Sequence, residues 1–123
     1  MKRFLLLLLA SLSLSVAIGW QASIAQQISA EQQFQNAAIA YISHGFRDPD
    51  DIVIRKLSVS SDERYALASW NYLEIGGMTV LKKEGEKIKV LTHGGGAINQ
   101  AGLEAVGIPA RSAIELLSEN EAR

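Results

Sequence analysis

The chain has 123 residues, a formal net charge of −1 at pH 7 and no cysteine. The lack of cysteine excludes disulfides, thiol catalysis and thiolate ligands for zinc or copper. This mild acidity, which rises to a net charge of −3 once residues 1–25 are removed, argues against nucleic acid or an anionic membrane surface as the partner. A chain of this length has room for a single small domain.

The first 25 residues are typical of a secretory signal peptide. A basic pair precedes an apolar stretch that runs from Phe4 to Ile18. Small residues at Ser23 and Ala25 satisfy the small-x-small rule for cleavage before Gln26. We therefore expect a signal peptide at 1–25 and an exported protein, either periplasmic or secreted.

An uncleaved membrane anchor is the alternative. The stretch from Phe4 to Trp20 is close to the shortest length that spans a bilayer, about 17 residues. Serines dilute it, however, and no positive cluster follows to stop transfer. Cleavage is the favoured interpretation. It leaves one mature domain at 26–123, with a net charge of −3 and no stable membrane anchoring.

A helix is predicted to begin at Ser29, which forms a capping box with Gln32. Gly45 is placed to end this helix, and Pro49 marks the turn that follows. Apolar residues recur at helical spacing along one stripe, formed by Phe34, Ala37, Ala38, Tyr41 and Ile42.

Two antiparallel strands are predicted after this turn. The first begins near residue 51, and its apolar residues are spaced by two with a change of parity at Arg55-Lys56, which predicts a bulge. A polar turn at 60–63 leads to the second strand, from Tyr65 to Leu73. We expect Gly76-Gly77 to close that strand.

Two further strands form a predicted hairpin, at 78–83 and 87–92, with Gly85 in its turn. Helical spacing resumes from Ala97 to Val106, and a last helix is expected to begin near Pro109. The sequence thus predicts an α+β fold, with an N-terminal helix, a four-stranded antiparallel sheet and two short C-terminal helices. We expect the helices to cover one face of the sheet.

The segment His93-Gly94-Gly95-Gly96 is the strongest candidate for a binding site. Three glycines before a helix expose backbone amides, which together with the helix dipole favour a carboxylate or phosphate. The alternative, which we favour, is a connector whose glycines permit positive φ or close packing. No Lys-Ser/Thr pair follows, so the segment is not a nucleotide-binding loop.

A metal site in the mature chain would draw on His44, Met78 and His93, whose predicted positions lie apart. His93 is the candidate ligand among them. Trp70 shares a strand face with Tyr72, either as part of a recognition surface or, the favoured interpretation, packed under a helix.

Several landmarks of the sequence occur together, namely residues 66–70, Gly76-Gly77, Leu81, Gly85, the glycines at 94–96 and residues 107–110. They resemble those of small exported bacterial proteins described as copper uptake system-associated. The resemblance covers roughly residues 50–118, and it implies an association with copper handling but no catalytic residue. Many such relatives have a cysteine just before the glycine-rich loop, where this chain has His93, and some have a longer C-terminal extension.

We therefore expect an exported binding or accessory module for an unidentified protein or small ligand, and the resemblance adds an association with copper handling. A small periplasmic metal-binding protein is the alternative. An enzyme is a third and weaker possibility, because neither histidine lies in a nucleophile-elbow context. No catalytic residue or cofactor is assigned, and the binding candidates are His93, Gly94, Gly95, Gly96 and Trp70.

If the signal peptide is removed as predicted, the exported protein begins at Gln26. Intact-mass measurement of the secreted or periplasmic material tests this, with allowance for partial cyclisation of Gln26 to pyroglutamate. An exported chain that retains Met1 would show that the cleavage prediction is wrong.

Overall fold

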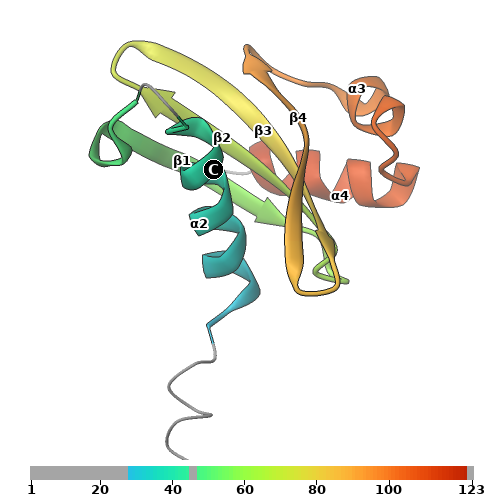
Figure 1. Cartoon of the computed structure of the whole chain (residues 1–123). Helices are drawn as coiled ribbons and strands as arrows, with labels where there is room; N and C mark the ends of the chain where they lie inside the picture. The colour runs from blue at the N-terminus through green and yellow to red at the C-terminus, as the bar shows by residue number, and fades with distance from the viewer. Residues whose placement is uncertain (1–27, 45–46, 122–123) are drawn as a thin grey trace, which may run out of the picture.

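A computed structural model of the protein describes residues 28–44 and 47–121 (Figure 1). The predicted signal peptide, its cleavage site and Gly45 lie outside these residues. The elements are α2 (Ala30–Ile42), the 3₁₀ turn η1 (Pro49–Asp51), β1 (Ile52–Val59), β2 (Tyr65–Tyr72), β3 (Ile75–Glu84), β4 (Lys87–Gly95), α3 (Gln100–Ala105) and α4 (Ala110–Glu121). The strands form one antiparallel sheet in the order β1-β2-β3-β4, which confirms the predicted α+β fold.

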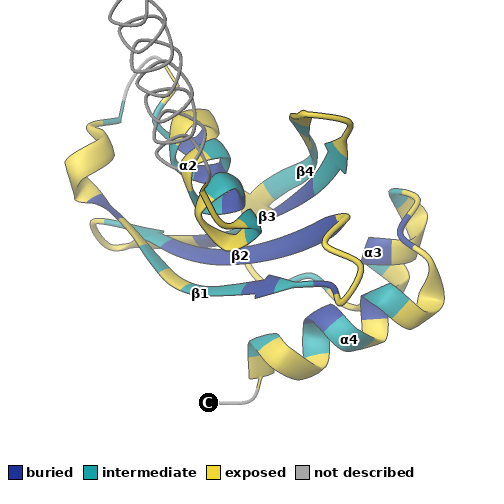
Figure 2. Cartoon of the chain, turned by 90° about the horizontal axis from the view of Figure 1, so that it is seen from below, coloured by how far each residue is buried: buried dark blue, intermediate teal, exposed yellow. Residues whose placement is uncertain are grey.

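Helices cover both faces of the sheet, so the expectation of one covered face is wrong (Figure 2). Helix α2 packs on one face, while α3 and α4 pack on the other. The reason lies in β2, where six successive residues, Tyr65 to Trp70, are buried. An inner strand that is buried on both faces has no polar alternation. The small residues Ala66, Ala68 and Ser69 obscured this in the sequence.

The start of α2 is capped as predicted. The Ser29 hydroxyl oxygen accepts a hydrogen bond from the backbone N–H of Gln32 at 3.1 Å. The Gln32 side chain does not reach back to the cap, and it donates instead to Asn36. The buried stripe of α2 is Phe34, Ala38 and Ile42, which packs against the sheet.

Both edge strands of the sheet, β1 and β4, contain a bulge. The predicted bulge in β1 is confirmed, because the register with β2 shifts between Ile54 and Lys56 and leaves Arg55 as the extra residue. A second bulge, in β4, was not predicted. There Val80 lies opposite Thr92 and Leu81 lies opposite Val90, so Leu91 is extra. This bulge reverses the parity of the strand and turns His93 toward the α2 face.

The turn between β2 and β3 lies at Leu73-Glu74, so the prediction that Gly76-Gly77 closes β2 is wrong. Both glycines belong to β3. Gly77 pairs with Trp70, and a Cβ on Gly77 would lie 2.6 Å from Cζ2 of the indole and would also overlap the carbonyl oxygen of Gly94. Gly77 is therefore required by close packing and not by a turn.

The C-terminal helices are short, and α4 is tied to the sheet by polar contacts. Helix α3 begins at Gln100, three residues later than predicted, and the Asn99 side chain caps it by accepting from the N–H of Gly102. Near the end of α4, Asn120 accepts from the Ser69 hydroxyl at 2.9 Å and donates to Ser58. These contacts fix the end of α4 on β2 and on the last residues of β1.

Replacing Gly77 with alanine tests the close packing of Trp70. The added methyl group collides with the buried indole and with the β4 backbone, so we expect Gly77→Ala to lower the free energy of unfolding by about 1–3 kcal/mol. Gly94→Ala is the matched control, since a Cβ there meets no atom within 4 Å and should change stability by less than about 0.5 kcal/mol. Equal unfolding midpoints in urea for the two variants would refute the packing argument.

Candidate functional site

The candidate site lies at one end of the sheet, which we call the glycine-rich end. Strand pairing brings its parts together, because Gly76 pairs with Asn71 of β2, while Gly77 pairs with Gly95 of β4. On the other side, Val53 pairs with Asn71. The glycine-rich end consists of Val53, Leu73, Ile75, Gly76, Gly77, Gly94, Gly95 and Gly96.

His93 and Trp70, which the sequence analysis named separately, are in direct contact. Their rings are stacked with centroids 5.2 Å apart and an interplanar angle of 5°. The ring of Tyr41, on α2, meets the edge of the same imidazole at 5.1 Å. His93 therefore sits between the sheet and α2, beside the glycine-rich end.

A short hydrogen-bonded chain fixes the imidazole. Trp70 Nε1–H donates to Thr79 Oγ1 at 2.9 Å, and Thr79 Oγ1 lies 2.8 Å from His93 Nδ1. With a neutral imidazole protonated on Nε2, the threonine hydroxyl accepts from the indole and donates to Nδ1. Each of the two contacts of Thr79 Oγ1 then joins one donor to one acceptor. We assign this tautomer because it lets Thr79 Oγ1 accept from the indole and donate to the imidazole.

Protonation of His93 disturbs this chain. The imidazolium carries a proton on Nδ1. Thr79 Oγ1 would then have to accept hydrogen bonds from both the Trp70 indole and the His93 imidazolium, and its own hydroxyl proton would need another acceptor. Burial lowers the pKa of His93 below its ordinary value, and the positive charge of Arg47 lowers it further. His93 is therefore held neutral at pH 7.

Trp70 itself belongs to the core. It is 2% exposed and packs under α2, as the favoured interpretation of the sequence predicted. Because it is buried, the Trp70 ring can contact a ligand only at its edge, or affect a ligand indirectly through its contact with His93. Trp70 is accordingly a support for the site and not its surface.

The three glycines after His93 differ from one another. Gly94 and Gly95 are extended residues of β4, whereas Gly96 follows the strand with φ of 91°. Helix α3 starts only at Gln100, and the Asn99 side chain fills its N-cap. The structure thus separates the glycines from the helix start that the anion-binding hypothesis places beside them.

Two small hollows adjoin the glycine-rich end. One, of about 190 Å³, is lined by Met78 and residues 92–98. The other, of about 300 Å³, is lined by Arg55, Gly76, Gly77, Met78, Gly96 and Ala97. Met78, Gly96 and Ala97 line both hollows, so the two are neighbours, and Met78 belongs to the side of the sheet that packs against α3 and α4.

The three possible metal ligands are not brought together. Met78 packs with the core beneath α3 and α4, and its sulfur accepts from the N–H of Ile98, whereas His93 lies on the α2 face. His44 is exposed beyond the end of α2. In the part of the chain that the structure describes, no three His, Cys, Asp or Glu side chains are grouped to hold a metal ion.

Three residues of the site were missed in the sequence. Tyr41 was counted only as a member of the apolar stripe, yet it is 48% exposed and contacts His93. Thr79 carries no distinctive pattern. Arg47 lies over the ring of Tyr72, at 5.5 Å from its centroid, and donates to the carbonyl of Ile42. Only strand register and the β4 bulge place these side chains together.

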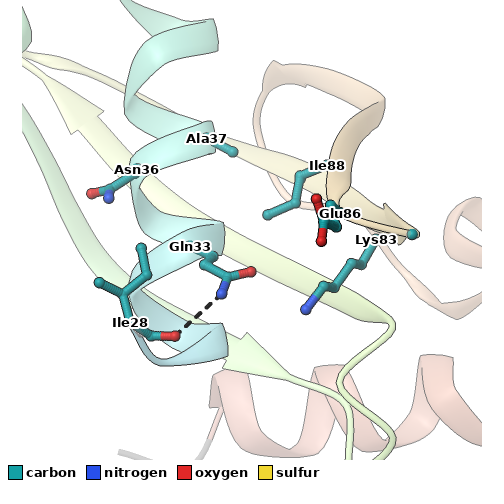
Figure 3. Close-up of a pocket in the computed structure, with 8 residues that line it drawn as sticks. Ile28, Gln33, Asn36, Ala37, Lys83, Glu86 and Ile88 are labelled. Atoms are coloured by element: carbon teal, nitrogen blue, oxygen red, sulfur yellow. Dashed lines mark hydrogen bonds between the residues drawn. The ribbon is translucent and has the colours of Figure 1, made fainter. Parts of the chain in front are cut away.

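A larger groove, of about 580 Å³, lies between α2 and the β3–β4 hairpin (Figure 3). Ala37 and Ile88 form its apolar part, and the Gln33 amide donates to the carbonyl of Ile28 at its mouth. Lys83 extends from the hairpin toward Gln33. None of the predicted site residues lines this groove, so it is a second and separate candidate.

No protein-family model, curated protein or solved structure matches the chain. The helices within residues 28–44 and 47–121 are each too short or too polar to cross a membrane. The arrangement of residues at the glycine-rich end is therefore the main guide to function.

The neutral state of His93 predicts how stability depends on pH. Because the pKa is lower in the folded chain, the unfolded chain binds the proton more readily, and stability is lost as the pH falls below about 6.5. We expect His93→Gln to reduce the fall in melting temperature between pH 7.5 and pH 5.5. The control is His44→Gln, which should keep the wild-type slope. Parallel slopes for wild type and His93→Gln would contradict this assignment.

Proposed function

We propose that the protein is an exported accessory module that binds a partner through the glycine-rich end of its sheet. The observation that carries the proposal is the exposure of large apolar side chains there. Leu73 is 67% exposed, Val53 57% and Ile75 55%. They lie at the same end of the sheet, with Ile75 on the α2 face and Val53 on the opposite face. Exposed apolar side chains beside bare backbone are typical of interaction sites.

The backbone at this end supports the proposal. Leu73 has φ of 54°, a left-handed conformation that is unfavourable for a residue with a side chain. Glycine or asparagine would relieve this cost. Residues in such conformations are frequent at functional sites, where an exposed side chain is presented at the expense of stability.

The helices leave this end uncovered. Asn120 anchors α4 at the level of Ser58 and Ser69, and Val53 lies beyond that level on the same face. On the other face, the contact of Tyr41 with His93 fixes the end of α2. The glycine-rich end thus projects from a well-packed base, which suits a rigid binding surface.

Charge narrows the class of partner. Asp50 and Asp51 lie just before β1, and Glu74 lies in the turn between Leu73 and Ile75. Arg47 and Arg55 also lie near this end, so charges of both signs are present and a polyanionic partner is not favoured. A protein or a small ligand with apolar character fits better. Copper handling is supported only by the resemblance, and in this structure it would act through such a partner.

Site-specific photocrosslinking in the producing cells tests the proposal. The photoreactive residue p-benzoylphenylalanine replaces Ile75 in one variant and Ile114 in the other. The two isoleucines are similarly exposed, at 55% and 51%, but Ile114 lies on the outer side of α4. We expect a discrete adduct from position 75 and none from position 114.

The variant Gly95→Val provides the second arm. A Cβ on Gly95 would make only an ordinary contact, 3.5 Å from the carbonyl oxygen of Gly76, so the variant should fold, as circular dichroism and melting would show. We expect it to reduce the adduct at position 75 at least several-fold. Equal adducts at positions 75 and 114, or no adduct at either, would refute the proposal.

A further inference from the structure

Among residues 28–44 and 47–121, no strand pairs with the outer side of β4, and this edge, which we call its border, differs along its length. Border strands leave a row of unpaired N–H and C=O groups, and proteins guard them with lysines and bulges. The first half of β4 has both devices, with exposed Lys87 and Lys89 followed by the bulge at Leu91. The second half, from Thr92 to Gly95, has neither. The other border, β1, is interrupted by its own bulge at Arg55.

The glycines of this second half are not explained by the fold. A Cβ on Gly94 would meet no atom within 4 Å, and one on Gly95 only a single ordinary contact. Neither residue has positive φ. Side chains would therefore fit at both positions, and their absence leaves the strand border bare. Bare backbone of this kind is typical of close approach by another chain.

The hollow beneath β4 suits a side chain from such a neighbour. Gly94 pairs with Met78, and both lie on the α3 and α4 side of the sheet. A residue placed opposite Gly94 on an added strand would point to the same side. There it meets the hollow of about 190 Å³ lined by Met78 and residues 92–98. Met78 is an adaptable apolar contact.

We infer that the partner contributes an extended polypeptide segment, which pairs with residues 92–95 on the border of β4 and places a bulky apolar side chain against Met78. Only an extended backbone matches the alternating donors and acceptors of a strand border. Side chains on the other face of the added strand would lie near Gly95, beside the edge of Trp70. This inference rests on the proposed function, since it specifies the partner of the same surface.

The probe is a phage-displayed library of linear decapeptides, selected on the mature chain at 26–123. Enriched peptides are synthesised and titrated by calorimetry against wild type and two variants. Gly94→Lys adds a side chain in open space and blocks the border, and we expect it to weaken binding at least tenfold. Ser118→Lys, on the exposed side of α4, adds the same charge and should leave the affinity unchanged.

N-methylation of the peptide identifies the strand pairing. Methyl groups on every second amide should abolish binding in one register and spare it in the other, because only alternate amides face β4. Peptides that bind equally well to Gly94→Lys, or respond equally to both methylation registers, would overturn the inference. So would failure to enrich any peptide over a parallel selection on Gly94→Lys.

The peptide-binding experiment and the photocrosslinking experiment test the inference and the proposed function separately. An adduct at position 75 without strand-like peptide binding would retain the glycine-rich end as a binding surface and refute only the added strand. Self-association of the mature chain in sedimentation, lost in Gly94→Lys, would identify a second copy as the occupant. That result would overturn the inference of a separate partner.

Discussion

The contact between Trp70 and Gly77 is the constraint on which this end of the molecule depends. A buried indole cannot lie across a neighbouring strand unless that strand lacks a side chain at the point of contact, and Gly77 meets this need. The position of the indole then fixes its N–H on Thr79, and Thr79 in turn fixes His93. The orientation of three side chains thus follows from one missing Cβ.

The same constraint divides the site into a supporting part and an exposed part. Trp70, Thr79 and His93 join the sheet to α2 and are largely withdrawn from solvent. Leu73, Ile75 and the glycines after His93 face outward. The aromatic cluster therefore acts as a positioning device, while the proposed binding surface is the apolar turn and the bare strand border. His93 is here a neutral, hydrogen-bonded spacer between the sheet and α2.

Much of the fold could be predicted because local signals were strong. Ser29 at a helix start, the change of parity at Arg55 and Gly85 in a hairpin each have a direct physical meaning. The bulge at Leu91 gave no such signal, since Val90 and Leu91 are both apolar and either could have faced the core. The turn at Leu73-Glu74 was missed because neither residue is a usual turn former.

The candidate site was predictable only in pieces. His93, Trp70 and the glycines at 94–96 were named from their types, but their contact depends on strand register, which a single sequence does not specify. Tyr41 and Thr79 could not be found, because a tyrosine on a helix stripe and a threonine in a strand are ordinary in both places. The sequence analysis expected His44, Met78 and His93 to lie apart, and strand register places Met78 and His93 on opposite faces of the sheet.

The most direct measurement is the indole signal in the ¹H–¹⁵N NMR spectrum of the mature chain, where Trp70 is the only tryptophan. Its N–H should exchange slowly with solvent at neutral pH, and exchange should quicken in Thr79→Val. Its resonance should also shift as His93 titrates, with a midpoint below about 6.5, and this shift should vanish in His93→Gln. An indole proton that exchanges freely, and whose exchange rate and resonance are the same in both variants as in the wild type, would contradict the central role of the Trp70 contact.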